Sequence, residues 1–321
     1  MLFLLSPAKT QRSEVSFTAP SSASLSSPEF LSEANVVAEA LASLPTDKLR
    51  SLLNVSAAIG EIAATRTRSF AMTASLSPAV FVFDGPAYRS LDAASLTKEG
   101  LVYLQSSLCI ICPLYGALRP LDAIKNYRLE MNSKLNVGAF TNLYLFWGEK
   151  VAKAAVRRAL LSSPTHPTIV NVASEEYAVA VLKHAASLSG VRVVNVRFPG
   201  ASVHAKAARG AIVRYAAVHG LQTVEGLRAF TGSKGELRFD EKATTKDNLV
   251  FIRTKSGAGA EAGAGAGAGA EEEGMGESEV VEGKAAPNAK KAVKAEVKKI
   301  VKVVVKAVKV KAVKPRVKAK V

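Results

Sequence analysis

The amino-acid sequence predicts a single mixed α/β domain, of the α+β kind, over residues 1–253, followed by a disordered tail. Apolar runs of strand length alternate with segments whose apolar residues recur at helical spacing, which is typical of this fold class. The composition changes abruptly after Arg253, which marks the end of the domain. A length of 321 residues suffices for one large domain or two small ones.

The first predicted elements are a short strand and a helix. Met1 to Leu5 is apolar and ends at Ser6 and Pro7, which favours a short buried strand. Ser27, Pro28 and Glu29 have the order of an N-cap, a first-turn proline and a first-turn acid. Apolar residues follow at helical spacing, so we expect a helix from residue 28 to about residue 44.

The run from Leu49 to Arg68 predicts two short helices around a turn near residues 55–60. This is the shape of a helix-hairpin-helix element, in which backbone N–H groups face a DNA phosphate. Arg50, Arg66 and Arg68 are suitably basic. Gly60 is the one glycine here, where a typical hairpin has two, so an ordinary helical pair is the alternative.

The remaining elements follow from hydrophobic runs and turn residues. We expect a strand at 80–83, a buried strand or helix at 101–111, helices at 148–161 and 204–219, strands at 168–173 and 191–198, and an antiparallel pair formed by 235–240 and 249–253. Gly220 is placed to close the second of these helices.

The last 68 residues are of low complexity. Residues 254–283 read as a linker that is first rich in Gly and Ala and then acidic, and residues 284–321 as a basic tail of Lys, Val and Ala. Valine weakens helix propensity, so we expect disorder that orders on a polyanion. A merely solvated appendage is the alternative.

The charge balance is basic in both parts of the chain. Residues 254–321 contain 15 Lys and Arg against 8 Asp and Glu, which leaves 28 against 19 for residues 1–253. A basic domain favours polyanionic partners such as nucleic acid. No run is long enough to span a membrane, and Met1 to Leu5 lacks the features of a signal peptide. Two cysteines fit a reducing compartment, either the cytoplasm or the nucleus.

The stretch from Pro113 to Met131 mixes charges of both signs with tyrosines and prolines. Cores do not tolerate such charges unpaired, and rigid turns suit a preorganised polar site. A buried salt-bridge network that joins two elements is the alternative.

Five separated motifs resemble the YaaA peroxide-stress family of bacteria, from residue 1 to about residue 253. They are MLFLLSPAKT at Met1 to Thr10, the stretch Pro113 to Met131, LYLFWG at Leu143 to Gly148, NVASEEY at Asn171 to Tyr177 and KAARG at Lys206 to Gly210. The resemblance implies a mixed α/β fold with a basic cleft and a helix-hairpin-helix element. It also implies duplex-DNA binding without enzymatic activity, in the defence against peroxide and free iron.

The resemblance and the side-chain chemistry together suggest the site residues. For contacts with DNA phosphates we expect Lys9, Arg119, Arg128, Lys206 and Arg209. For orienting the cleft we expect Asp122, Tyr127, Glu130, Ser174 and Glu175. Lys206 and Arg209 lie three apart on one helix face, and Gly210 allows a close approach there.

Two other functions remain open from the sequence. Arg119, Asp122, Arg128 and Glu130 would serve an enzyme acting on nucleotides or nucleic acid, with a carboxyl group as acid or base. In a third reading, the basic tail is a charge-driven scaffold and performs all the binding.

No cofactor or metal is predicted. Cys109 and Cys112 form a lone CxxC without a second pair or a nearby histidine, so a zinc site is not expected. In a straight strand, residues three apart face opposite sides and cannot form a disulfide. We therefore expect two core cysteines, with redox sensing as the lesser alternative.

Overall fold

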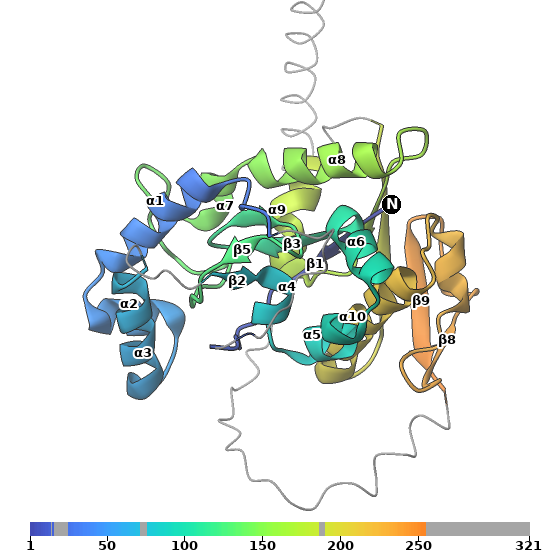
Figure 1. The fold of residues 1–321 in the computed structure, drawn as a ribbon, viewed down its shortest axis with the longest axis horizontal. Helices are drawn as coiled ribbons and strands as arrows, with labels where there is room; N and C mark the ends of the chain where they lie inside the picture. The colour runs from blue at the N-terminus through green and yellow to red at the C-terminus, as the bar shows by residue number, and fades with distance from the viewer. Residues whose placement is uncertain (14, 16–24, 71–75, 186–189, 255–321) are drawn as a thin grey trace, which may run out of the picture. The chain divides into compact units, whose positions relative to one another are not determined.

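The computed structural model describes residues 1–13, 15, 25–70, 76–185 and 190–254 (Figure 1). Over these residues it confirms the predicted mixed α/β class. The predicted linker and basic tail lie outside the described residues, apart from Thr254.

A seven-stranded sheet with the order β4-β3-β1-β6-β7-β9-β8 forms the centre of the domain. Its strands are β1 (Leu2–Leu5), β3 (Leu108–Cys112), β4 (Gly116–Leu118), β6 (Thr168–Asn171), β7 (Arg192–Arg197), β8 (Leu237–Phe239) and β9 (Asn248–Arg253). The five inner strands are parallel, and β4 and β8 pair antiparallel at the two edges. Every residue of β1, β3 and β6 is buried, as expected for parallel strands covered on both faces. A separate pair is formed by β2 (Ser77–Pro78) and β5 (Ala123–Ile124).

Ten α-helices surround the sheet among the described residues. They are α1 (Leu31–Ala42), α2 (Thr46–Leu53), α3 (Ala57–Arg68), α4 (Ala79–Val82), α5 (Pro86–Leu91), α6 (Lys98–Ser107), α7 (Leu143–Trp147), α8 (Lys150–Ser162), α9 (Glu175–Ala185) and α10 (Ser202–Val218). Two 3-10 turns lie at Ala93–Ser95 and Glu225–Ala229. Helix α8 runs along one side of the sheet, and the packed pair of α5 and α10 lies on the other side (Figure 1).

The strand order reverses at β1. The chain passes from β1 to its neighbour β3, then crosses back to β6 on the other side of β1, and continues outward through β7 to β9. At such a reversal the loops that follow neighbouring strands leave a crevice beyond their carboxyl ends. The topology therefore places a candidate site where Ser6 follows β1 and Ser174 follows β6.

Several predicted elements are confirmed. Helices α8 and α10, strands β6 and β7, and the antiparallel pair of β8 and β9 lie where the sequence pattern predicts them. Gly220 has a φ of 58° just after the end of α10 and closes that helix. The segment predicted as a strand or a helix at 101–111 is divided between α6 and β3.

The predicted start of the first helix is wrong by about one turn. Helix α1 begins at Leu31 rather than at Pro28, because the preceding residues are held by long-range contacts. The Ser26 N–H donates to the Leu121 carbonyl at 3.0 Å, and the Ser27 carbonyl accepts from the Arg119 guanidinium at 2.9 Å. Glu29 is paired with two arginines of α8, Arg157 at 2.6 Å and Arg158 at 3.2 Å.

Replacing Glu29 with glutamine is expected to destabilise the protein by about 2 kcal/mol at neutral pH, since hydrogen bonds to charged groups contribute about 1.5–3 kcal/mol. Burial of the Glu29 carboxyl opposes its ionisation, but the hydrogen bond from Arg157 and the charge of Arg158 prevail and hold its pKa below the usual 4.5. Because the pKa is lowered in the folded state, this stabilisation is present above pH 4.5 and is lost as the pH falls through the folded-state pKa. Urea unfolding of both proteins at several pH values tests this.

The control for this prediction is Glu61→Gln, which changes an exposed carboxylate on α3 that forms no ion pair among the described residues. Its effect on the free energy of unfolding should be small at every pH. Equal effects of the two substitutions at neutral pH would contradict a role for the Glu29 pair.

The predicted strand at 80–83 is a short helix instead. The N–H groups of Ala79 and Val80 donate to the carbonyls of Asp122 and Pro120, each at 2.9 Å, which curls the chain into α4. All four residues of α4 are buried, so an apolar run of this length does not by itself distinguish a strand from a buried helical turn.

Helices α2 and α3 form the predicted helical pair, joined by Asn54–Ser56, with Asn54 in the left-handed conformation. Gly60 lies inside α3 against the aliphatic part of Arg50 rather than in the turn. The pair is a helical hairpin, and its use as a DNA-binding element stays a prediction.

Cys109 and Cys112 both lie in β3 as free, fully buried thiols. Burial raises the pKa of Cys109 and raises that of Cys112 to about 12. The Cys112 sulfur lies 3.0 Å from the Tyr127 hydroxyl. Both thiols are therefore protonated at neutral pH, which is the state of an unreactive core cysteine.

Candidate anion-binding site

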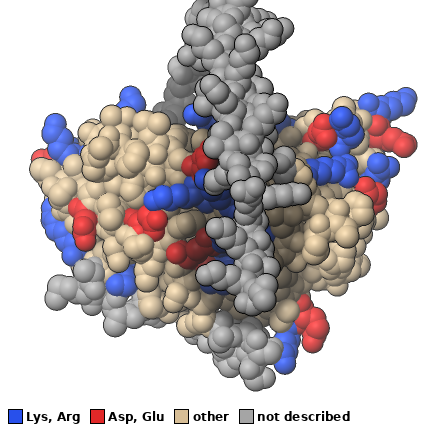
Figure 2. Space-filling view, turned by 90° about the horizontal axis from the view of Figure 1, so that it is seen from above, with Lys and Arg blue, Asp and Glu red and all other residues tan. Residues whose placement is uncertain are grey.

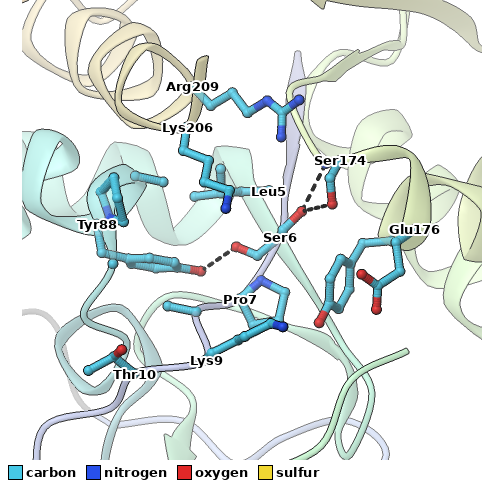
Figure 3. Close-up of a pocket in the computed structure, with 15 residues that line it drawn as sticks. Leu5, Ser6, Pro7, Lys9, Thr10, Tyr88, Ser174, Glu176, Lys206 and Arg209 are labelled. Carbon is cyan, nitrogen blue, oxygen red and sulfur yellow. Dashed lines mark hydrogen bonds between the residues drawn. The ribbon is translucent and has the colours of Figure 1, made fainter. Parts of the chain in front are cut away.

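The carboxyl ends of β1 and β6 are tied together by two serines. The Ser174 N–H donates to the Ser6 hydroxyl at 2.9 Å, and the two hydroxyl oxygens are 3.1 Å apart (Figure 3). The Tyr88 hydroxyl, from α5, donates to the Ser6 carbonyl at 3.0 Å. These hydrogen bonds join the loop after β1, the loop after β6 and helix α5, which are distant in the sequence, at the point where the strand order reverses.

A cavity of about 260 Å³ opens beside these serines. Its walls come from the loop after β1, the start of α5, the loop after β6 with the start of α9, and one face of α10. The lining residues are Leu5, Ser6, Pro7, Ala8, Lys9, Thr10, Gly85, Pro86, Ala87, Tyr88, Ser174, Glu176, Tyr177, Lys206 and Arg209. The structure thereby brings together four predicted site residues, Lys9, Ser174, Lys206 and Arg209.

Two cations of α10 extend over the serine pair (Figure 3). Lys206 is exposed and Arg209 is half-buried. Within the described ranges, no carboxylate lies at ion-pair distance from either of them. Burial lowers the pKa of Arg209, and the nearby charge of Arg197 at the end of β7 lowers it further. The guanidinium therefore lies among other positive charge, and an anion would stabilise it.

Lys9, Arg128 and Glu130 form a network at the edge of the cavity. The Lys9 ammonium lies 2.8 Å from the Glu130 carboxylate, and Arg128 lies 3.8 Å from the same oxygen. Arg128 also donates to the Lys9 carbonyl at 3.2 Å, and its buried Nε has no hydrogen-bond partner among the described residues. Arg128 therefore fixes the backbone of Lys9, while the Lys9 side chain remains 61% exposed.

Arg119 and Asp122 lie in a different network. Their side chains pair at 2.9 Å, and Asp122 is fully buried. Neither of them lines the cavity or contacts Arg128 or Glu130 in the described part of the chain. Four of the five charged residues of the Pro113–Met131 stretch thus serve two networks rather than one site, and the fifth, Lys125, donates to the Phe70 carbonyl apart from both.

Besides Asp122, two more residues expected to orient the cleft lie outside it. Tyr127 is buried beside Cys112, and Glu175 is exposed at the start of α9. Glu176 lines the cavity instead and accepts a hydrogen bond from the Asn132 N–H at 3.2 Å. Ser6 is a site residue that the sequence did not indicate, and Tyr88 is one of several tyrosines that the sequence allowed either at the cleft or in the core. The one available signal was the position of Ser6, between a buried strand and a proline.

Two further findings concern the described residues only. No group of three or more His, Cys, Asp or Glu side chains is arranged to hold a metal ion. No helix has both the length and the apolar composition needed to cross a membrane.

The chain matches the model of a family described as "Peroxide stress protein YaaA" over residues 1–243. It is 36% identical over 265 residues to a UPF0246 protein of Paracidovorax citrulli and 38% identical over 264 residues to one of Polaromonas. Each alignment covers 80% of this chain and 100% of the relative. A UPF0246 protein of Clostridium perfringens is 35% identical over 261 residues, with 79% of this chain and 100% of the relative covered. About a fifth of this chain therefore has no counterpart in these proteins.

Proposed function

Because this chain belongs to the YaaA family of peroxide stress proteins, we propose that it acts in oxidative-stress defence by binding duplex DNA with little sequence preference. The cavity and its rim would contact the phosphodiester backbone, which carries the charge of DNA without its sequence information. In this proposal the protein acts in the cytoplasm or the nucleus and limits damage by peroxide and iron.

The observation that carries the proposal is the pair of Lys206 and Arg209, which line a concave site without a carboxylate at ion-pair distance among the described residues. Lys9 adds a third cation at the rim, with a side chain that is 61% exposed, although Glu130 already pairs with its ammonium at 2.8 Å. Arginine grips phosphate oxygens through two parallel hydrogen bonds, and lysine acts as a mobile point charge. Arg119 is less suited to a contact, because the buried Asp122 already binds its guanidinium.

The basic residues of α8 differ from this pair. Lys150, Lys153 and Arg157 are paired with Glu33, Glu149 and Glu29 at 3.0, 2.8 and 2.6 Å. Figure 2 shows this face, on which basic and acidic side chains are interspersed. Such pairs neutralise each other, so the α8 face offers a polyanion less net charge than the cavity does.

A salt titration of duplex binding tests the proposal, with residues 1–253 measured beside the full chain. If Lys9, Lys206 and Arg209 each neutralise one phosphate, the logarithm of the affinity of residues 1–253 falls against the logarithm of salt with a slope of about −3. Lys206→Ala should weaken binding and reduce the slope by about 1. Lys242→Ala is the matched control, because Lys242 is an exposed lysine of the β8–β9 turn and lines none of the described cavities.

The same titration separates this proposal from the charge-driven scaffold. If the basic tail performs all the binding, residues 1–253 lose all measurable affinity for DNA. If the domain binds, the tail acts as a second polyanion-binding module on a flexible tether and adds affinity through effective concentration. No observation on the described residues favours the enzymatic alternative, whose four residues are divided between two networks.

A further inference from the structure

The cavity is too small for the duplex that the proposed function assigns to this face. Its volume of about 260 Å³ is near the lower limit of small-molecule sites, which span roughly 300–1,000 Å³. A double helix would lie across the mouth of the cavity and leave the interior empty. The interior therefore fits one small group, such as a phosphate with the sugar attached to it.

The polar groups inside the cavity are mostly hydrogen-bond donors. Lys206 and Arg209 extend from α10, and the hydroxyls of Ser6 and Ser174 lie beneath them (Figure 3). Glu176 is the one carboxylate among the lining residues, and it accepts the Asn132 N–H at 3.2 Å. Pro7, Ala8 and Pro86 supply an apolar wall of the kind that packs against a sugar. This donor-rich lining selects an anion with several acceptor oxygens.

The amount of positive charge distinguishes between two kinds of phosphate. Three cations, Lys9, Lys206 and Arg209, line the cavity beside one carboxylate, Glu176, and Arg197 lies near Arg209 without lining the cavity itself. A phosphodiester brings one negative charge and two free oxygens. A phosphomonoester carries about −1.5 to −2 charges at pH 7 and three strong acceptor oxygens. The monoester therefore matches the cavity lining both in positive charge and in the number of hydrogen-bond donors.

We propose that the cavity between β1, β6, α5 and α10 binds the phosphomonoester of a nucleotide, through Lys206, Arg209 and the Ser6–Ser174 pair. The monoester comes either from the end of a DNA strand or from a free nucleoside monophosphate, which present the same group. This inference refines the proposed function, because the same face would recognise a strand end as well as the backbone.

The test compares three DNA probes on the full chain at one salt concentration. They are a short linear duplex with phosphorylated ends, the same duplex with hydroxyl ends, and a covalently closed circular duplex that has no ends. The phosphorylated duplex is expected to bind about tenfold more tightly than the hydroxyl duplex, as one added charge-assisted contact would produce. Binding of deoxythymidine monophosphate, compared with thymidine by calorimetry, tests the free nucleotide as the source.

Two substitutions assign the preference to the cavity. Lys206→Ala and Arg209→Ala should remove the difference between phosphorylated and hydroxyl ends, whereas Lys242→Ala and Arg238→Ala should retain it. Arg238 is an exposed arginine of β8, outside the cavity. Lys206 is exposed, so its variant folds even if the Arg209 variant does not, and a thermal melt verifies this.

The possible outcomes separate this inference from the proposed function. A preference for phosphorylated ends that depends on Lys206 supports the cavity with a strand end as its ligand. Binding of deoxythymidine monophosphate that depends on Lys206, without any preference for ends, assigns the cavity to a free nucleotide. If neither probe gains from its phosphate, the inference is overturned, while a loss of affinity for the circular duplex in the Lys206→Ala variant still supports the proposed function. Binding of the nucleotide without binding of any duplex refutes the proposed function and leaves the cavity assigned.

Discussion

Replacing Gly210 with alanine is expected to destabilise the protein by about 3 kcal/mol, because an added methyl group would force two helices apart. A Cβ atom at Gly210 would lie 1.7 Å from the Ala87 carbonyl oxygen and 2.5 Å from its carbon. These atoms belong to the backbone of α5, so no side-chain rotation relieves the overlap. The free energy of unfolding in urea measures the effect.

Gly60→Ala is the matched control, since Gly60 is also a glycine inside a helix. Its added Cβ would lie 3.0–3.3 Å from the Cγ, Cβ and Cδ atoms of Arg50, a tight contact with a side chain rather than an overlap with backbone. Alanine favours helix over glycine by up to about 1 kcal/mol, which offsets part of this cost, so this variant should lose far less stability than the Gly210 variant. Equal stabilities of the Gly210 and Gly60 variants would mean that α5 and α10 do not pack as closely as the structure has them.

Replacing Asp122 with asparagine is expected to cost about 3–5 kcal/mol, the range for breaking a buried ion pair. The carboxylate is fully buried and accepts from the Ser26 hydroxyl at 2.6 Å and from the Arg119 N–H at 2.7 Å. It also binds the Arg119 guanidinium at 2.9 Å. An asparagine would turn a donor NH2 group toward these donors and leave the Arg119 charge without its partner. Urea unfolding measures the loss.

Asp247→Asn provides the control, because Asp247 is exposed and forms no ion pair among the described residues. Its change in unfolding free energy should stay within about 0.5 kcal/mol. The Asp122 variant also distinguishes structural from functional roles of the carboxylate. If its stability is unchanged while DNA binding is lost, Asp122 orients the binding site, and its part in the buried network has been overestimated.

The candidate site was partly predictable from the sequence. The loop at Ser174 follows a buried strand, where α/β proteins place functional residues, and Lys206 and Arg209 are three apart on a helix. Both statements depend on local periodicity, which a sequence displays directly. The pairing of Lys9 with Glu130 and the contact of Tyr88 with Ser6 join residues far apart in the chain, so no local pattern indicates them.

The wrong predictions from the sequence have the same cause, which is that long-range contacts leave no local pattern. Ser27, Pro28 and Glu29 have the local chemistry of a helix start, but contacts with Arg119, Leu121, Arg157 and Arg158 outweigh that preference. Local propensities amount to roughly 1 kcal/mol, and several long-range hydrogen bonds together exceed this. Gly210 is a second case. The sequence predicted a close approach there, which suggested a phosphate, and in the structure the group that approaches is the backbone of Ala87.

The sequence alone determined the fold class, the order of most elements and the membership of this chain in its family, because these depend on hydrophobic periodicity and on local motifs. Only the tertiary structure decided which charged groups are neutralised and which are not. Arg119 and Lys206 look equivalent in the sequence, yet a buried carboxylate holds the first, and the second faces a cavity at the reversal of the strand order. The energy of a charge depends on its neighbours in space, and the folding of β1, β6 and α10 onto one another determines those neighbours.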